Sequence, residues 1–380
     1  MTRSSRPSNV EHPLALGSFR VWLRLLERSG GIDRAYAKRV VFVTLTTLLT
    51  SPLRIWERVR YRRAVRGSSI HPEPIFILGH WRSGTTHLHN LMCQDTNLGF
   101  LTTFQAMAPG FCLTGDGIIK RLLAKAAAAR HPTRVIDNVP LVLDAPQEDE
   151  FALCNLSPVS FLHAFTLPRK AREIFEESVL LDRVAPRDLA KRVRSYEMVL
   201  RKATLRAGGR RLLLKNCAST GHIEALLKAF PEARFIHIHR NPYDVFLSTL
   251  HLYRTAIPRF QIQEIGDGEI EACVLAFYDR AMHAYLAARS KIPAGRHVEV
   301  RFEELETAPL AEVKRIYEAL QLPGFAKAEA DFRAYIESVS GYKKNAYELN
   351  ADVIETVNRH WSFAFDQWGY ERIETDRKED

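Results

Sequence analysis

The segment PIFILGHWRSGTT, at residues 74–86, is the most informative part of this sequence about its fold. It opens with an apolar run, Pro74 to Leu78, that has the length of a buried strand. Two glycines five positions apart, Gly79 and Gly84, follow the run and allow the backbone to curl and point N–H groups at an anion. The apolar spacing beyond Thr86 indicates a helix. The stretch therefore predicts a strand, a phosphate-binding loop of the P-loop type and a helix.

The loop is rich in groups that bind phosphate. Arg82 is its only cation, and Ser83, Thr85 and Thr86 carry hydroxyls at the start of the predicted helix, where the helix dipole favours negative charge. Thr85 stands where nucleoside triphosphatases have a lysine. The loop is therefore predicted to bind a phosphate without gripping a γ-phosphate and magnesium. A tight turn with a purely structural role is the alternative.

Strands alternate with helices along the rest of the chain. Such alternation implies right-handed crossovers and an α/β fold of three layers, with a mostly parallel sheet covered on both faces. Ligands then bind at the carboxyl ends of the strands. The predicted strands and their following helices are 212–214 with 223–230, 234–239 with the helix after Pro242, and 297–302 with 305–320.

Length and composition are those of a globular protein. The 380 residues are 46% hydrophobic and 26% charged, which excludes a disordered, collagen-like or low-complexity chain. We expect one elaborated domain over residues 71–373. A helical N-terminal extension over 1–70 precedes it, and a charged tail over 374–380 follows.

The net charge of +10 favours anionic or phosphorylated partners. Nucleic acid is not expected, because the densest basic run, residues 187–215, is typical of a solvated helix face.

The five cysteines are scattered without a CxxC pair, which argues against a disulfide framework and a cysteine zinc site. Residues 1–13 lack the apolar core of a secretory signal, so a cytoplasmic location is expected.

The apolar stretch from Val40 to Trp56 contains four threonines, a proline and an arginine, and so is a poor membrane span. It is predicted to be one docked amphipathic helix. Arginines follow it at positions 58, 60, 62 and 63. Peripheral contact with an anionic membrane, or the lining of a lipophilic acceptor site, is the alternative.

The stretch at residues 74–86 resembles the 5′-phosphosulfate loop of the sulfotransferases that use 3′-phosphoadenosine 5′-phosphosulfate (PAPS). In that family a strand-end arginine and a serine eight residues later hold the 3′-phosphate of the donor, and Arg240 and Ser248 have this spacing here. The patches that resemble the bacterial branch of the family are 144–153, 214–217, 230–234 and 342–345. The resemblance spans residues 74–369 and implies a kinase-like fold with a P-loop. Lys343 and Lys344 resemble the late basic loop that closes over the 3′-phosphate, with a solvated lysine pair as the alternative.

The resemblance also implies roles in catalysis. Sulfuryl transfer requires a deprotonated acceptor, cations at the developing charge and in-line placement, and Arg and Lys are sufficient without a metal ion. Arg82 is expected to serve the bridging 5′-phosphate oxygen. Lys215, at a predicted strand end, is expected to reach the same charge, with an ion pair at the sheet edge as its alternative.

The general base is the least determined role. Many sulfotransferases place a histidine two residues after a strand-end lysine, but this chain has Cys217 there. The acidic segment at 148–150 offers a carboxylate, since neighbouring carboxylates raise one another's pKa. Glu148 is favoured and Glu150 is the alternative, while a salt-bridge role for the segment also remains open. His80 and His222 are further candidates.

These observations predict a PAPS-dependent sulfotransferase that moves a sulfonate to a hydroxyl, or alternatively an amine, of a small or lipophilic acceptor. The runner-up is a P-loop small-molecule kinase that uses ATP. A third hypothesis is an inactive module that binds anions or a membrane surface. The sequence does not indicate an oligomeric state.

Overall fold

The computed structural model describes residues 12–130, 142–341 and 347–374. Within them, five parallel strands form a sheet in the order β2-β3-β1-β4-β5. The strands are β1 (Ile75–Leu78), β2 (Leu98–Gly99), β3 (Arg211–Lys215), β4 (Arg234–His239) and β5 (His297–Arg301). The α/β class and the mostly parallel sheet are therefore confirmed, and only β2 was not predicted.

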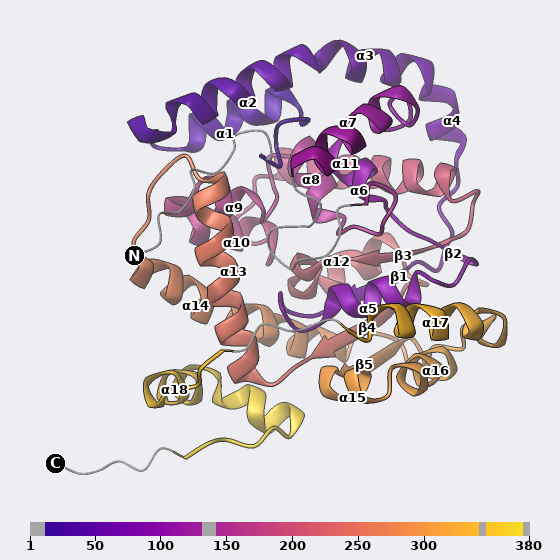
Figure 1. The fold of residues 1–380 in the computed structure, drawn as a ribbon, viewed down its shortest axis with the longest axis vertical. Coiled ribbons are helices and arrows are strands. Elements are labelled where there is room, and N and C mark those ends of the chain that lie inside the picture. Colours follow the sequence, from indigo (N-terminus) through magenta and orange to yellow (C-terminus); the bar gives the residue numbers. More distant parts are fainter. Residues whose placement is uncertain (1–11, 131–141, 342–346, 375–380) are drawn as a thin grey trace.

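Alternate residues of each central strand pack into different hydrophobic clusters, because successive side chains of a strand point to opposite faces. On β1, Ile75 and Ile77 belong to one cluster, while Phe76 and Leu78 belong to the other. Both faces of the sheet are thus buried, as a parallel sheet requires. The result is a three-layer structure (Figure 1).

Helices that follow β1 and β5 cover the face of Ile75 and Ile77. They are α5 (Thr85–Met92), α15 (Phe302–Thr307), α16 (Pro309–Ala319) and α17 (Phe325–Val339). The predicted single helix over 305–320 is wrong, because Pro309 lacks the N–H that would continue a helix and instead begins α16.

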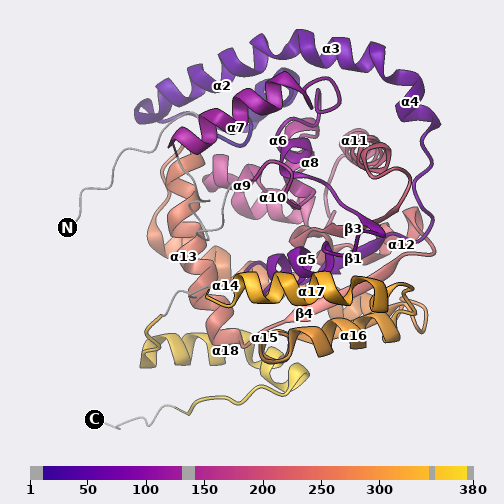
Figure 2. The same cartoon turned by 45° about the vertical axis from the view of Figure 1, so that its right-hand side comes forward.

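The opposite face is covered by a larger set of helices. The main ones are α11 (Pro186–Arg206), α12 (Ile223–Ala229), α13 (Pro242–Phe260), α14 (Asp267–Arg289) and α18 (Ala351–Trp368). Shorter segments are α6 (Thr103–Met107), α8 (Glu150–Leu156), α9 (His163–Thr166), α10 (Ala171–Ser178), and the 3-10 turns η2 (Arg34–Tyr36), η3 (Pro168–Lys170) and η4 (Cys217–Gly221). Helix α7 (Ile118–Arg130) lies near the N-terminal helices (Figure 2).

The N-terminal helices run along one end of the molecule, opposite α18 (Figures 1 and 2). They are α1 (Phe19–Arg28), α2 (Ala37–Leu49), α3 (Ser51–Arg60) and α4 (Arg62–Gly67). The expected single helix from Val40 to Trp56 is therefore two, because Pro52 lies in the first turn of a new helix. Trp22 and Val43 share a hydrophobic cluster with Phe76 of the sheet. The domain boundary at residue 70 stays a prediction.

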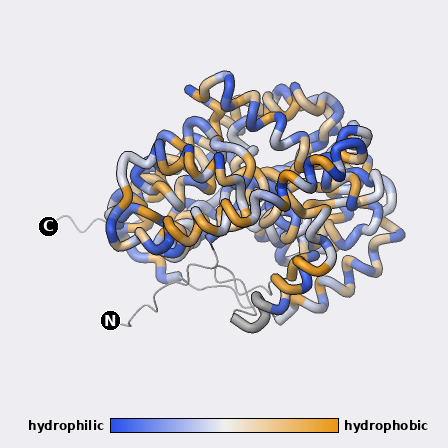
Figure 3. Tube along the Cα trace, turned by 90° about the horizontal axis from the view of Figure 1, so that it is seen from above, coloured by the Kyte–Doolittle hydropathy of each residue, from blue (hydrophilic) through white to orange (hydrophobic). Residues whose placement is uncertain are grey.

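Hydrophobic and hydrophilic residues alternate along the helices of the molecule (Figure 3). The basic run at 187–215 is only in part a solvated face. Its first section is α11, in which Arg192 and Lys202 are buried, and its end is strand β3.

No helix among the described residues is long and apolar enough to cross a membrane.

Candidate active site

The loop between β1 and α5 has the conformation that its glycines predict. Gly79 and Gly84 have φ angles of 141° and 95°. A Cβ atom on Gly79 would lie 2.4 Å from the carbonyl oxygen of Ile238 on the neighbouring strand, and one on Gly84 would lie 2.2 Å from the ring of Phe302. Only glycine fits either position without displacing a neighbour. Gly84 is the N-cap of α5, so the helix N-terminus opens directly onto the loop.

Arg82 connects the loop to α13. Its backbone has a φ of 72°, which is uncommon for a residue with a side chain. Its Nε donates a hydrogen bond of 2.8 Å to Oγ of Ser248 on α13. The structure therefore joins two residues that the sequence analysis assigned to different phosphate groups.

Arg240 completes the same cluster from the end of β4. Its Nη1 donates to the carbonyl oxygen of Arg82 at 3.4 Å, and its Nη2 lies 3.0 Å from Oδ2 of Asp244. The guanidinium carbon is 4.7 Å from the ring centroid of Phe302. Nε is buried without a hydrogen-bond partner in the described structure. A buried donor without a partner is unfavourable, so this nitrogen is suited to an anion.

The hydroxyl residues of the loop differ in exposure. Ser83 and Thr85 are buried, whereas Thr86 is half-buried. The N–H of Ser83 donates to the carbonyl oxygen of His80 at 3.2 Å. Oγ1 of Thr85 lies 3.5 Å from Sγ of Cys217, which follows β3. The loop is thus packed against the neighbouring strand end.

Lys215 and Glu148 form a buried ion pair next to this loop. Lys215 ends β3, which pairs with β1. Its Nζ lies 2.6 Å from Oε2 of Glu148, and the N–H of Cys217 donates to Oε1 of Glu148 at 3.2 Å. Glu148 is thereby held at the carboxyl edge of the sheet by two groups of the β3 strand end.

Glu150 occupies a different environment at the first position of α8. Its Oε1 accepts hydrogen bonds from Oγ of Ser160 at 2.6 Å and from the N–H of Phe161 at 2.9 Å, and its Oε2 accepts one from Asn216 at 2.8 Å. Burial raises the pKa of Glu150, but Arg192 and these hydrogen bonds outweigh it, so the pKa lies below its ordinary value. Such a carboxylate is fully bonded and weakly basic.

Asp149, between the two glutamates, is the residue of this segment whose pKa is raised. Burial raises the pKa of Asp149 to about 7, against a hydrogen bond from Tyr196 that lowers it. The hydroxyl of Tyr196, on α11, donates to Oδ2 of Asp149 at 2.7 Å. Charge from the neighbouring glutamates contributes less than burial. The expectation that mutual repulsion raises the pKa of Glu150 is wrong, because the surrounding donors favour its charged form.

Of the two histidine candidates, His80 is buried and His222 is half-buried, and both are hydrogen-bonded to backbone. Nδ1 of His80 lies 2.9 Å from the carbonyl oxygen of Trp81, and burial lowers its pKa to about 3. Nδ1 of His222 lies 2.8 Å from the carbonyl oxygen of Val179, and burial lowers its pKa to about 4. Both are therefore weaker bases than a free imidazole, and the sequence alone did not show this burial.

Several residues around the site were not predicted. Tyr196, Arg192 and Asn216 fix the acidic segment from α11 and from the residue after β3. The spacing of Tyr196 with the buried Val199, Leu200 and Ala203 of α11 is the signal that could have indicated that Tyr196 faces the core. Lys343 and Lys344 lie outside the described residues. Among the described residues, no group of three or more His, Cys, Asp or Glu side chains is placed to hold a metal ion.

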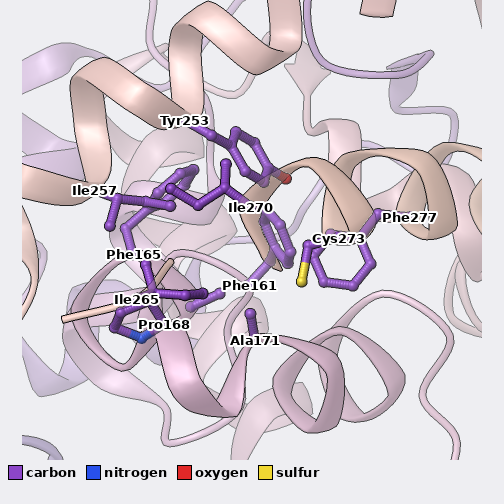
Figure 4. A pocket seen from close by; sticks show the side chains of 11 residues that line it. Phe161, Phe165, Pro168, Ala171, Tyr253, Ile257, Ile265, Ile270, Cys273 and Phe277 are labelled. Carbon is purple, nitrogen blue, oxygen red and sulfur yellow. The ribbon is translucent and has the colours of Figure 1, made fainter. Parts of the chain in front are cut away.

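Residues of α9, α10, α13 and α14 line a small apolar pocket (Figure 4). Phe161, Phe165, Tyr253, Ile257 and Phe277 are among its lining residues. Its free space is about 10 Å³, which is roughly the room for one water molecule. The ring of Phe161 is also 4.4 Å from that of Trp81 in the loop. Phe161 and Phe165 therefore pack in the hydrophobic core, and Phe161 supports the loop through Trp81.

Fold and site together define an α/β protein whose loop after β1 gathers arginine and hydroxyl side chains at the carboxyl edge of a parallel sheet. Residues 74–327 match the profile of the "Sulfotransferase family". The chain belongs to the sulfotransferase family. This assignment supports the predicted enzyme class and not the kinase alternative.

Two curated relatives are similar over nearly the whole chain. Both carry the name "Omega-hydroxy-beta-dihydromenaquinone-9 sulfotransferase Stf3", one from Mycobacterium bovis and one from Mycobacterium tuberculosis. Each is 31% identical over 373 residues, which cover 98% of this chain and 95% of the relative.

Solved structures share the fold. Sulfotransferase STF1 from Mycobacterium tuberculosis H37Rv has a TM-score of 0.68 at 20% identity, with 91% of this chain and 92% of that chain covered. Sulfotransferase STF9 from Mycobacterium avium has a TM-score of 0.66 at 21% identity, with 98% and 99% covered. At these identities the likeness supports the three-layer fold.

Proposed function

We propose that this sulfotransferase takes its sulfonate from PAPS and transfers it to a hydroxyl of a lipophilic acceptor, with Glu148 as general base. The observation that carries the proposal is the meeting of Arg82, Arg240 and Ser248 at the carboxyl ends of β1 and β4. A nucleotide with phosphate groups at both its 5′ and 3′ positions requires two such anion sites on neighbouring βα units.

The donor would lie across this cluster. The buried Nε of Arg240 and the hydroxyl of Ser248 fit the 3′-phosphate, since both are donors and one has no partner within the described structure. The N-terminus of α5, with Thr85 and Thr86, fits the 5′-phosphosulfate. Arg82 then lies between the two phosphate groups and would exchange its bond to Ser248 for bonds to the donor.

Transfer would proceed in line. The acceptor oxygen forms a bond to sulfur while the bond between sulfur and the 5′-phosphate oxygen breaks, and 3′-phosphoadenosine 5′-phosphate leaves. The acceptor proton goes to the carboxylate of Glu148. Lys215, which lies 2.6 Å from that carboxylate, positions it and adds positive charge near the leaving oxygen.

Glu148 fits the role of base better than its neighbours do. It has one contact to an ammonium and one to a backbone N–H. Glu150 has three hydrogen-bond donors and a nearby guanidinium. Asp149 is fully buried and bonded to Tyr196. Glu150 is thus occupied by structural contacts, and Asp149 and Glu150 have no exposed surface, whereas Glu148 keeps 6% of its surface exposed and so is the carboxylate that an acceptor can approach.

The acceptor class follows from the relatives, whose name specifies omega-hydroxy-beta-dihydromenaquinone-9. We propose for this chain an acceptor of the same chemistry, a hydroxyl at the end of a long isoprenoid chain. An amine is the alternative acceptor group.

The test is a transfer assay followed by mass spectrometry. Purified protein is incubated with PAPS and an omega-hydroxylated isoprenoid quinone, and in parallel with a short-chain alcohol. We expect the quinone to gain one sulfonate group and the short alcohol to react more slowly. Phosphorylation of either acceptor with ATP and magnesium, without sulfation from PAPS, would overturn the proposal.

A further inference from the structure

The outer face of α2 and α3 is unusually apolar for a protein surface. Val41, Leu45, Leu48 and Leu49 recur at helical spacing on α2, and Ile55, Trp56 and Val59 do so on α3. The exposed fractions of these seven side chains run from 49% for Leu48 to 74% for Leu49. We call this set the α2–α3 surface.

The two helices present one continuous face. Thr50, between them, keeps a right-handed helical conformation with φ −85° and ψ −3°. At 100° per residue, the exposed positions of α3 therefore fall on the same side as those of α2. Both views show α2 and α3 following one another along the end of the molecule (Figures 1 and 2).

The inner face of these helices is firmly attached to the core. Glu57 of α3 is buried, and it accepts a hydrogen bond from Nζ of Lys202 at 2.5 Å and from the N–H of Thr114 at 2.7 Å. On α2, Thr44 accepts a hydrogen bond of 2.8 Å from Nε1 of Trp22. The apolar residues are thus held outward by a rigid scaffold, and loose packing of the helices does not explain their exposure.

The surface is flanked by positive charge. Between residues 34 and 66 the sequence has nine Lys or Arg and one acidic residue, the buried Glu57. Seven of the basic side chains are exposed, and none of the seven forms an ion pair with another described residue. They are Arg34, Lys38, Arg58, Arg60, Arg62, Arg63 and Arg66.

Helix α7 extends the apolar area. Ile119 and Leu123 of α7 pack with Leu53 of α3 in one cluster, so the two helices are neighbours. Ile118 and Leu122, one turn apart on α7, are exposed. Apolar area of this size with a basic border is typical of a contact surface.

We propose that the α2–α3 surface binds the surface of a bilayer that contains anionic phospholipid. The helices lie in the plane of the interface, with the apolar residues inserted between headgroups and the arginines bound to lipid phosphates. Trp56 lies at headgroup depth, where tryptophan is favoured. The opposite charges of surface and lipid favour this partner over a second copy of the same basic face. The inference does not depend on the proposed acceptor.

The experiment is vesicle flotation of the full chain without any substrate. Vesicles contain phosphatidylcholine with phosphatidylglycerol, or phosphatidylcholine alone. We expect binding to the anionic vesicles that is lost at high salt, because surface charge is screened there. Leu49→Glu/Trp56→Glu should lower binding at least about tenfold, and so should Arg60→Gln/Arg62→Gln/Arg63→Gln.

Matched variants on another exposed helix serve as controls. Val193→Glu and Arg187→Gln/Arg194→Gln on α11 also change exposed residues, and they should leave vesicle binding unchanged. Thermal melting checks that every variant is folded. The proposal is overturned if wild-type protein ignores both vesicles, or if the α2–α3 variants bind as well as wild type. It is also overturned if sedimentation shows that this face forms a dimer that excludes vesicles.

Discussion

Nε of Arg240 is buried and has no hydrogen-bond partner among the described residues. We predict that Arg240→Ala lowers affinity for 3′-phosphoadenosine 5′-phosphate by about 10- to 100-fold, the usual effect of losing a hydrogen bond to a charged group. Adenosine 5′-phosphosulfate, which lacks the 3′-phosphate, should bind almost as before. Titration calorimetry measures both ligands. Arg254→Ala, on α13 but paired with Asp267, is the matched control, and equal losses for both nucleotides would contradict the assignment.

Glu148 and Glu150 are only two residues apart in the sequence, but their side chains contact different groups. Glu148→Gln should keep nucleotide binding and reduce turnover by about 100-fold or more, because a positioned base contributes on that scale. Glu150→Gln should act mainly on stability, because it alters a carboxylate that holds Ser160, Phe161 and Asn216. Steady-state rates and unfolding curves of both variants distinguish the roles. A variant pair with the opposite pattern would exchange the assignments.

Asp149 should make the stability of the protein depend on pH. Its folded pKa is raised to about 7, so between about pH 4 and 7 the folded state binds more protons than the unfolded state. The contribution of this group to the free energy of unfolding is therefore present at low pH and is lost as pH rises toward 7. Asp149→Asn should reduce the loss of stability between pH 5 and pH 8, as measured by denaturant unfolding. An unchanged pH profile would show that Asp149 is ionised throughout.

At the level of the elements, the turn from β1 into α5 depends on Gly84. Gly84→Ala places a methyl group against the ring of Phe302 at a φ of 95°. We expect a loss of at least about 1 kcal/mol in the free energy of unfolding, together with weaker nucleotide binding. Urea unfolding and calorimetry test this. Gly117→Ala, which has open space around it, should change neither quantity, and a Gly84→Ala variant that matched it would show that the turn tolerates a side chain.

The sequence predicted the elements that carry a periodic pattern or a strong turn signal. The strands at 75–78 and 211–215 were found because each contains a short apolar run, and the strand at 234–239 was found because its β-favouring residues alternate with polar ones. The two-residue β2 is too short for a pattern. The break at Thr50 was overlooked although Pro52 indicated it, because the apolar run continues across it.

The parts of the candidate site that could be predicted are those whose residues have a recognisable spacing within one motif. Arg240 and Ser248 lie on one βα unit, and in the structure each of them contacts Arg82. The bond between Arg82 and Ser248 joins two βα units that are far apart in the sequence, and local spacing does not reveal it. Tyr196 was missed because it lies in a basic helix, where the inner face is less evident than the charged outer face.

Across the whole molecule, the strand order determines where the chemistry lies. β1 is central, with β3 on one side and β4 on the other, so Lys215 and Arg240 flank the loop from opposite sides. Neighbouring strands such as β1 and β3 are separated by more than 130 residues of sequence, as the pairing of Ile75 with Leu213 shows. Their order is set by long-range packing of the helices between them, which local patterns do not specify.

The proposed function requires that this chain bind a 3′-phosphorylated adenosine nucleotide at the Arg82, Arg240 and Ser248 cluster. The most direct test is calorimetric titration of the purified protein with 3′-phosphoadenosine 5′-phosphate, and in parallel with ATP plus magnesium. We predict tight binding of the former and little or no heat from the latter. Preference for ATP would contradict the assignment of Arg240 and Ser248 and with it the proposed donor.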